Sequence, residues 1–273
     1  MSLMVWGTSS NAGKTIMCSV ICRHLFRNGV DVVPFKGSNL SSASFVTVSG
    51  EELGMGQALQ AWACEIEPYS DMNPVLLKPH NGHLHYVLNG HPYDVSKSVP
   101  SRSDLLAHAC EAYDRLSDAH DVVICEGSGA PSEINLMEVD VANVGMVRER
   151  GMNVILVCDI ERGGMFAALY GTWLLVPDNI RPLVKGFVIN RFRGDDSILE
   201  PGIRRIENLT GMKCLGIMPY VRDISLPEED SFVGEAPDSD DLMAMRDSYV
   251  GSLDELTDIA ESSMDMDLLR SFI

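Results

Sequence analysis

The chain has 273 residues, of which 45% are hydrophobic, and a formal net charge of −18. This length permits one large domain or two small ones, and no apolar run approaches the roughly 20 residues of a membrane span. The amino terminus carries no basic flank or cleavage site, so we expect no secretion signal. These features predict a cytoplasmic protein that does not cross a membrane.

The acidic charge is concentrated at the carboxyl end. Residues 223–273 hold 15 acidic and two basic side chains, which gives a net charge of −13. The whole chain has 39 acidic and 21 basic residues. The first 222 residues therefore hold 24 acidic and 19 basic side chains, a net charge of −5. The body is therefore compatible with an anionic ligand. Because no basic stripe is visible, we expect no nucleic-acid partner.

Strand-like and helix-like segments alternate along the body. Apolar runs predict strands at residues 3–6, 30–35, 121–125, 153–158, 185–189 and 214–218. Helical spacing predicts helices at residues 15–27, 103–116 and 201–209, the second with Ser103 as its N-cap. Alternation of this kind predicts an α/β fold, a doubly wound and mostly parallel sheet with helices on both faces.

The turn between the first predicted strand and helix has the composition of a phosphate-binding loop. It reads Gly7-Thr8-Ser9-Ser10-Asn11-Ala12-Gly13-Lys14-Thr15. Small residues let backbone N–H groups turn inward onto a phosphate, and the helix adds its positive dipole end. We expect Lys14 to reach the β- and γ-phosphates and the Thr15 hydroxyl to ligate Mg²⁺. The remaining nucleotide contacts that we expect in this loop are Thr8, Asn11, Ala12 and Gly13.

The spacing of this loop leaves an alternative open. Five residues, rather than the usual four, separate Gly7 from Gly13-Lys14-Thr15. A glycine-containing turn that binds nothing would have a similar composition.

The strand–helix alternation is interrupted between residues 66 and 100. This stretch contains several Pro and Asn residues and four of the seven histidines: His80, His83, His85 and His91. We interpret it as a solvated loop and hairpin insertion. A metal site is the alternative, but the spacing lacks a zinc pattern and no Cys or carboxylate falls among the histidines.

Charged side chains directly follow two of the predicted strands. Glu126 and Lys36 stand at carboxyl ends of strands, where ligands collect in parallel sheets. We expect Glu126 to share Mg²⁺ with Thr15, the alternative being an acid that faces solvent. We expect Lys36 to neutralise a substrate carboxylate or a transferring phosphoryl group.

Two further loops at strand ends carry polar and charged residues. Arg162 lies in the flexible loop after the fourth predicted strand, and Asn190 and Arg191 follow the fifth. The amide of Asn190 would pair with the adenine edge, and Arg191 would meet anionic groups.

The composition of the chain changes near residue 228, where it becomes strongly acidic, and near residue 252, where helical spacing of apolar residues returns. We predict that residues 1–227 form the main domain, that residues 228–251 form a flexible acidic linker, and that residues 252–273 form a C-terminal helical segment. The seven cysteines lie in apolar segments without metal spacing, so we expect reduced thiols.

Several longer motifs make a family resemblance specific. They are Pro34–Lys36, Gly56–Ala61, Asp71–Pro79, Glu126–Leu136, Asp159–Gly164 and Gly186–Asp195. Together they closely resemble cobyric acid synthase over about residues 4–222. The wider fold group includes dethiobiotin synthetase, a P-loop protein whose phosphate loop has the same extra residue.

This resemblance implies ATP-dependent amidation of corrinoid carboxylates, which converts cobyrinic acid a,c-diamide to cobyric acid in cobalamin biosynthesis. A carboxylate is a poor acyl donor, but phosphorylation by ATP gives a carboxyl phosphate that ammonia attacks. The expected cofactors are ATP and Mg²⁺. The expected catalytic residues are Lys14, Lys36 and Glu126, and the expected substrate contacts are Lys36, Asn39, Asn135 and Arg162.

The sequence departs from the family pattern in two respects. Family members have a glutamine amidotransferase domain with a nucleophilic Cys, which we expect to be absent here. Ammonia would then come from solution or from a separate glutaminase subunit, unless this sequence is part of a longer protein. Ser49 stands where the family tends to have Asp. If that Asp helps hold Mg²⁺ in the family, we expect Glu52, or else Glu51, to take its place, the alternative being altered metal binding.

Two other functions stay open from the sequence. One is a related ligase that acts on another tetrapyrrole or a small carboxylate, as dethiobiotin synthetase does. The other is a switch ATPase regulated by a partner, although such proteins usually carry an extra lysine where this loop has Ser9, Ser10 and Asn11. A homodimer is compatible with each of these functions.

Overall fold

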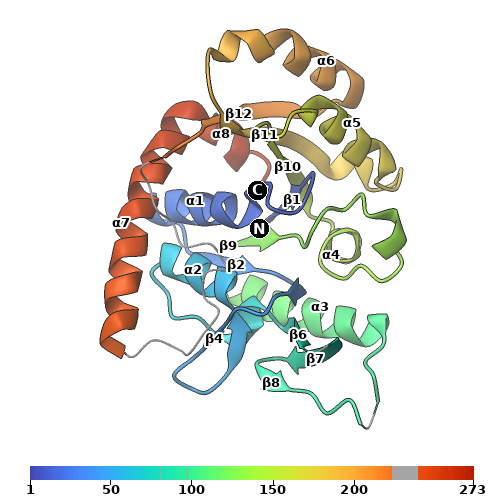
Figure 1. Cartoon of the computed structure of the whole chain (residues 1–273), viewed down its shortest axis with the longest axis vertical. Helices are drawn as coiled ribbons and strands as arrows, with labels where there is room; N and C mark the ends of the chain where they lie inside the picture. The colour runs from blue at the N-terminus through green and yellow to red at the C-terminus, as the bar shows by residue number, and fades with distance from the viewer. Residues whose placement is uncertain (81, 97, 223–238) are drawn as a thin grey trace.

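The computed structural model describes residues 1–80, 82–96, 98–222 and 239–273. Within these residues the central sheet is parallel and has the strand order β12-β11-β10-β1-β9-β2 (Figure 1). Its strands are β1 (Ser2–Gly7), β2 (Val32–Phe35), β9 (Val122–Glu126), β10 (Asn153–Asp159), β11 (Val184–Phe192) and β12 (Lys213–Pro219). All of the predicted strands are therefore confirmed.

Helices cover both faces of this sheet. They are α1 (Lys14–Arg27), α2 (Met55–Ala63), α3 (Arg102–Ala119), α4 (Val144–Arg150), α5 (Met165–Leu175), α6 (Glu200–Thr210), α7 (Ser239–Ser263) and α8 (Met266–Arg270). Short 3₁₀ helices are η1 (Ser70–Met72), η2 (Ile134–Leu136), η3 (Arg181–Leu183) and η4 (Asp196–Leu199). In the described part of the chain, no helix has both the length and the apolar character that a membrane crossing requires.

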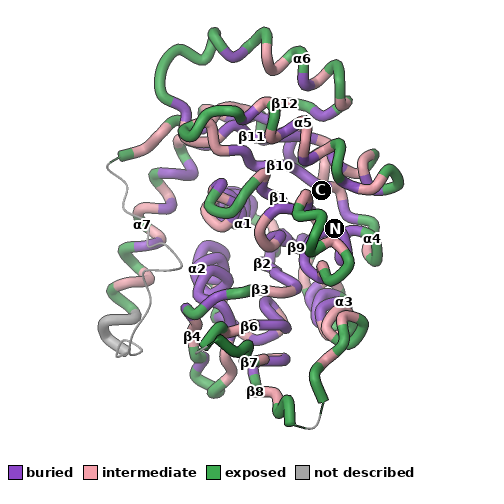
Figure 2. The backbone as a smooth tube through the Cα atoms, turned by 45° about the vertical axis from the view of Figure 1, so that its right-hand side comes forward, coloured by how far each residue is buried: buried purple, intermediate pink, exposed green. Residues whose placement is uncertain are grey.

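The side chains of β1 alternate between two hydrophobic cores. Met4 and Trp6 pack with residues of α3, α4, α5 and α6, whereas Leu3 and Val5 pack with residues of α1, α2, α7 and α8. Figure 2 shows the resulting buried centre between exposed outer turns. Because a strand buried on both faces needs apolar residues at every position, the continuous apolar runs follow directly from this arrangement. The predicted doubly wound α/β fold is confirmed.

The start of α3 differs from the prediction. Ser101, rather than Ser103, is the N-cap: its hydroxyl accepts a hydrogen bond from the Asp104 N–H at 3.2 Å. The Asp104 carboxylate in turn accepts one from the Ser101 N–H at 2.9 Å. This reciprocal capping box satisfies two backbone donors that the helix leaves without partners, which favours the earlier start.

Small sheets lie beyond β2, the last strand in the order of the main sheet (Figures 1 and 2). One contains β3 (Asn39–Leu40), β6 (Val75–His80), β7 (His83–Leu88) and β8 (His91–Pro92), and the other contains β4 (Ser44–Val46) and β5 (Glu52–Gly54). Strands β6 and β7 form the hairpin predicted within residues 66–100. The rings of His80 and His85 meet edge to face with centroids 5.8 Å apart.

Only part of the predicted acidic linker falls within the residues that the structure describes. Residues 223–238 lie outside the described residues, and residues 239–251 belong to α7 rather than to a linker. The predicted C-terminal helical segment contains the rest of α7 and all of α8. Apolar residues of α7, such as the buried Tyr249 and Leu253, pack in the same core as α1.

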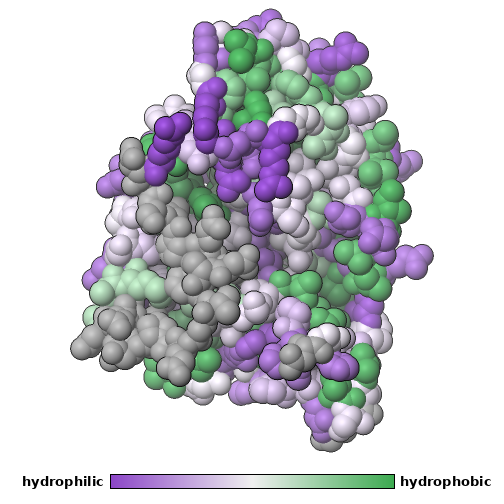
Figure 3. Space-filling view, viewed as in Figure 1, coloured by the Kyte–Doolittle hydropathy of each residue, from purple (hydrophilic) through white to green (hydrophobic). Residues whose placement is uncertain are grey.

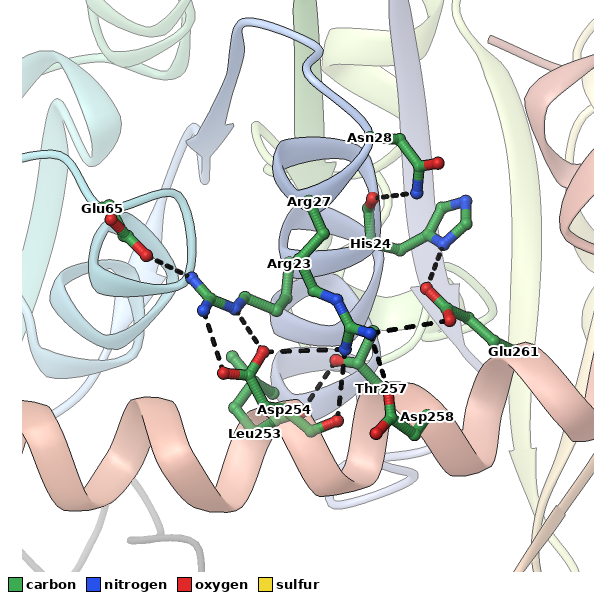
Figure 4. A network of polar contacts seen from close by, with 10 residues as sticks. All are labelled: Arg23, His24, Arg27, Asn28, Glu65, Leu253, Asp254, Thr257, Asp258 and Glu261. Atoms are coloured by element: carbon green, nitrogen blue, oxygen red, sulfur yellow. Dashed lines mark hydrogen bonds and ion pairs between the residues drawn. The ribbon is translucent and has the colours of Figure 1, made fainter.

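Ion pairs explain why this acidic sequence becomes an ordered helix (Figure 4). The buried Arg23 on α1 donates to both Asp254 oxygens at 2.7 and 2.9 Å and to Glu65 at 2.9 Å. Further contacts join Arg27 to Asp258 at 2.6 Å and His24 to Glu261 at 2.8 Å. The carboxylates of α7 thus face cations of α1, which composition alone does not reveal.

We predict that Arg23→Ala destabilises the protein by about 2 kcal/mol, because partly buried charge-assisted hydrogen bonds to Asp254 and Glu65 are lost. Urea unfolding measures this change. Arg204→Ala is the matched control, since the pair that Arg204 forms with Glu200 is exposed and such pairs contribute little. Equal destabilisation by the two substitutions would contradict the role assigned to Arg23.

Candidate nucleotide and metal site

A cavity of about 470 Å³ lies at the carboxyl edge of the central sheet. It is lined by most of the residues that the sequence predicted for the site: Asn11, Gly13, Lys14, Thr15, Lys36, Asn39, Glu126, Arg162 and Arg191. They lie at or just after the carboxyl ends of β1, β2, β9, β10 and β11, which a parallel sheet brings to one edge.

The loop between β1 and α1 is wrapped around the Lys14 side chain. Gly13 is left-handed, with φ of 99°, and a Cβ there would lie 2.2 Å from the Asn190 amide nitrogen. A Cβ on Gly7 would lie 3.0 Å from Lys14 Nζ, and this ammonium donates to the Ser9 carbonyl at 3.2 Å. Both glycines are therefore required by close packing, and the loop has the form of a phosphate cradle at a helix N-terminus.

Glu126 is the centre of the polar contacts in this cavity. It ends β9, is 1% exposed, and accepts hydrogen bonds through Oε1 from Thr15 Oγ1 at 2.9 Å and from Lys36 Nζ at 2.9 Å. The structure thus brings Glu126 together with Thr15, as the sequence predicted, and also with Lys36. Burial by itself would raise the pKa of the Glu126 carboxyl, but the charges of Lys36 and Lys14 hold that pKa below its ordinary value.

The paired oxygens of Thr15 and Glu126 fit a magnesium site. Their 2.9 Å separation is close to that of adjacent ligands in an octahedron with metal–oxygen bonds of about 2.1 Å. Mg²⁺ prefers oxygen ligands and keeps several waters, so a hydroxyl and one ionised carboxylate suffice on the protein side.

Two buried glutamines on α2 support Glu126 from the other side. Gln60 Nε2 donates to Glu126 Oε2 at 2.6 Å and to the Thr15 carbonyl at 3.3 Å, and Gln57 Nε2 approaches the same carboxylate oxygen at 3.4 Å. No role for these two glutamines was predicted from the sequence. The available signal was a pair of amides three positions apart in an otherwise apolar helix, since buried amides need polar partners.

Asn73 fixes the backbone at Lys36. This side chain is 1% exposed; its Nδ2 donates to the carbonyls of Lys36 at 2.9 Å and Val75 at 3.1 Å, and its Oδ1 accepts from the Gly54 N–H at 2.9 Å. The carbonyl of Met72 also accepts from the Lys36 N–H at 2.8 Å. The Asp71–Pro79 motif therefore ties the end of β2 to the start of α2.

Asn190 and Arg191 brace the phosphate loop. Asn190 Nδ2 donates to the Ala12 carbonyl at 3.0 Å, and Arg191 Nη1 donates to the Asn11 carbonyl at 3.1 Å and to Asp159 at 2.9 Å. Of the two residues, Arg191 lines the cavity and Asn190 does not. The adenine contact predicted for Asn190 therefore stays a prediction, and the described contact of its amide is with the loop backbone.

The structure places other predicted site residues outside the cavity lining. Glu52 lies on β5, where it accepts from Ser44 at 2.5 Å and pairs with Lys78. The metal role predicted for Glu52 stays a prediction. Asn135 is exposed on η2. The Thr8 N–H donates to the Val157 carbonyl at 3.0 Å, and Ala12 is fully buried. These two residues therefore support the phosphate loop on the side that faces the protein interior.

Comparison with known proteins identifies the family and the fold of the chain. The model of the CobQ/CobB/MinD/ParA nucleotide binding domain matches residues 3–232. The structure of the signal recognition particle receptor FtsY from Elizabethkingia anophelis is similar with a TM-score of 0.50 and 15% identity, over 92% of this chain and 65% of that chain. At this identity the likeness concerns the fold alone.

Curated relatives are much closer in sequence. The probable cobyric acid synthase of Methanoregula boonei is 50% identical over 238 residues, which are 85% of this chain and 49% of the relative. The cobyric acid synthase of Cutibacterium acnes is 46% identical over 233 residues, 84% of this chain and 48% of the relative. The chain thus spans about half the length of these relatives. It belongs to the CobQ/CobB/MinD/ParA nucleotide-binding domain family, and within that family it is similar to cobyric acid synthases.

Proposed function

We propose that this chain uses ATP and Mg²⁺ to activate a peripheral carboxylate of a corrinoid for amidation, as in the conversion of cobyrinic acid a,c-diamide to cobyric acid. The observation that carries the proposal is the meeting of Glu126 with Thr15 of the phosphate loop and with Lys36 in one cavity. The names of the relatives support the substrate class.

The chemistry proceeds in two steps. A carboxylate oxygen attacks the γ-phosphorus of ATP, the bond from that phosphorus to the bridging oxygen breaks, and ADP leaves. Ammonia then attacks the carbonyl carbon of the carboxyl phosphate, loses a proton, and expels inorganic phosphate to leave the amide. The first step requires two anions, the carboxylate and ATP, to approach each other, so its acceleration comes from positioning and from neutralisation of charge. The second step, in which the nucleophile is neutral, gains from positioning.

The residues of the cavity divide this work. Lys14 reaches the phosphates from within the loop, and Lys36 lies where it neutralises the incoming carboxylate or the transferring phosphoryl group. Thr15 and Glu126 would hold Mg²⁺, which supplies neutralisation of the phosphate charge when it is bound. Arg162 and Arg191 add positive charge at the rim.

The test is a reaction with ATP, Mg²⁺, ammonium chloride and cobyrinic acid a,c-diamide, followed by mass spectrometry and ADP measurement. Each amidation lowers the mass of the corrinoid by about one unit, because OH is replaced by NH₂, and releases one ADP by the balance above. Free ammonium avoids any need for a glutaminase subunit. ADP release that ignores every carboxylate supplied, and follows a protein partner instead, would indicate a switch ATPase.

We predict that Gln60→Leu raises the Mg²⁺ concentration for half-maximal activity by about tenfold, because residues that orient a metal ligand tune its affinity. Gln57→Leu is the matched control on the same helix, where the longer 3.4 Å contact predicts a smaller effect. Magnesium titrations of the two variants give the comparison. A Gln60 variant that saturates with Mg²⁺ at the wild-type concentration would contradict the role of Gln60.

A further inference from the structure

A second cavity, of about 440 Å³, lies beside the phosphate cavity. Ser10, Leu40, Ser128 and Gly129 line both cavities, so the two meet at the phosphate loop, at β3 and at the loop after β9. A group held in the second cavity therefore has a direct path to Lys14 and Lys36.

The walls of the two cavities differ in chemistry. The phosphate cavity presents the cations of Lys14, Lys36, Arg162 and Arg191. The second cavity is walled largely by apolar side chains, including Leu77, Leu105, Leu136, Met137, Val139 and Val141. An elongated ligand with an anionic end and an apolar body would match this division.

The apolar wall continues onto the surface. Leu40 is 58% exposed, Leu136 52% and Val139 61%, although each has a large hydrophobic side chain. In Figure 3, hydrophobic side chains appear at the surface on the side where Figure 1 places α4 and the loop before it. Exposed apolar surface that continues into a cavity is typical of a ligand-binding site.

Hydrogen bonds hold this wall in place. The Asp140 carboxylate accepts from the backbone N–H groups of Asn143 at 3.0 Å and Gly145 at 2.8 Å. Asn143 Nδ2 donates to the Ser128 carbonyl at 2.7 Å, which joins the wall to the loop after β9. The cavity is therefore preformed, which lowers the entropic cost of binding.

We propose that the second cavity seats one edge of the corrin macrocycle, so that a single peripheral carboxylate extends past Ser128 and Gly129 into the phosphate cavity. This inference rests on the proposed function. The methyl-bearing rim of a corrin is apolar, whereas the acetate and propionate arms that are not yet amidated are ionised, and this matches the two walls. Because a complete corrinoid is too large for the cavity, the rest of the ring lies on the exposed surface of Leu40, Leu136 and Val139.

Leu136→Asp tests whether the second cavity is the seat of the corrin edge, with Ile134→Asp as the matched control. Both positions lie on η2 and are exposed, at 52% and 63%, but only Leu136 lines the cavity. Binding of cobyrinic acid a,c-diamide is measured by equilibrium dialysis, and binding of ATP by calorimetry. We expect Leu136→Asp to weaken corrinoid binding by about tenfold or more, because a carboxylate placed against an apolar ligand loses hydration and repels the ligand's own carboxylates. ATP binding to both variants, and corrinoid binding to Ile134→Asp, should match the wild type.

The possible failures are distinct. If the wild-type chain binds the corrinoid and Leu136→Asp binds it equally well, or if Ile134→Asp weakens it as much, the seat is wrong while the proposed function stands. If the wild-type chain neither binds the corrinoid nor releases ADP in response to it, the proposed function is wrong, and the seat is overturned with it.

Discussion

Replacement of Lys14 by alanine should reduce carboxylate-dependent ADP formation by at least about 100-fold, which is the usual cost of removing one donor from a developing charge. Lys14 is 7% exposed in the phosphate loop and lines the cavity. Its hydrogen bond to Ser9 lies within that loop, so its loss leaves the core of the sheet intact. We therefore expect a variant that folds normally and does not turn over ATP.

Lys213→Ala is the control for this substitution. Lys213 is an exposed lysine at the start of β12, and it does not line the cavity. Thermal unfolding and ADP formation are measured for both variants. Wild-type ATP turnover by Lys14→Ala would contradict a role of the phosphate loop in the reaction. Equal losses of turnover in both variants would indicate a general effect of lost positive charge.

Glu126→Gln should lower kcat/KM by about 1,000-fold or more, because the substitution keeps the shape of the side chain and removes the charge that Mg²⁺ requires. The carboxylate accepts hydrogen bonds from Thr15 and Lys36 at 2.9 Å each. Its neutral replacement therefore also leaves the buried Lys36 ammonium without the negative charge that faces it. Raising the Mg²⁺ concentration should not restore the activity.

The comparison for Glu126→Gln is Glu149→Gln, which neutralises an exposed carboxylate on α4 away from the cavity. Kinetic titration with Mg²⁺ separates the two variants. Recovery of Glu126→Gln at high Mg²⁺ would show that this carboxylate tunes the affinity for the metal and is not needed as its ligand.

The sheet and the phosphate loop were predictable because their signals are local. Apolar runs and a loop ending in Lys14-Thr15 lie within short segments, and the parallel sheet then brings Glu126 and Lys36 to the same edge. The family resemblance was readable for the same reason, because its motifs are contiguous in the sequence.

The support of the site depends on partners that are distant in the chain. Gln60 meets a carboxylate 66 residues away, and the Asn73 amide serves the backbone of Lys36, 37 residues earlier. The spacing of these residues in the sequence does not predict which group each amide contacts. Glu52 lies on the short β4–β5 hairpin and pairs with Lys78, a contact that its position in the sequence does not reveal.

The acidic tail illustrates the same limit. Its composition favours a linker, because abundant like charge opposes a packed core. Arg23 and Arg27 on α1 offset that charge through Asp254 and Asp258, which lie 231 residues further along the chain. Charge complementarity between distant segments is a tertiary property, and composition within one segment does not report it.

The most direct test of the proposed chemistry follows an oxygen atom. A corrinoid with ¹⁸O in its carboxylates is incubated with the chain, ATP, Mg²⁺ and ammonium, and the phosphate products are analysed by mass spectrometry. Activation as a carboxyl phosphate predicts one labelled oxygen in inorganic phosphate for each amide formed, and none in AMP. Inorganic phosphate that carries no label, or label that appears in AMP, would contradict transfer of the γ-phosphoryl group to the carboxylate.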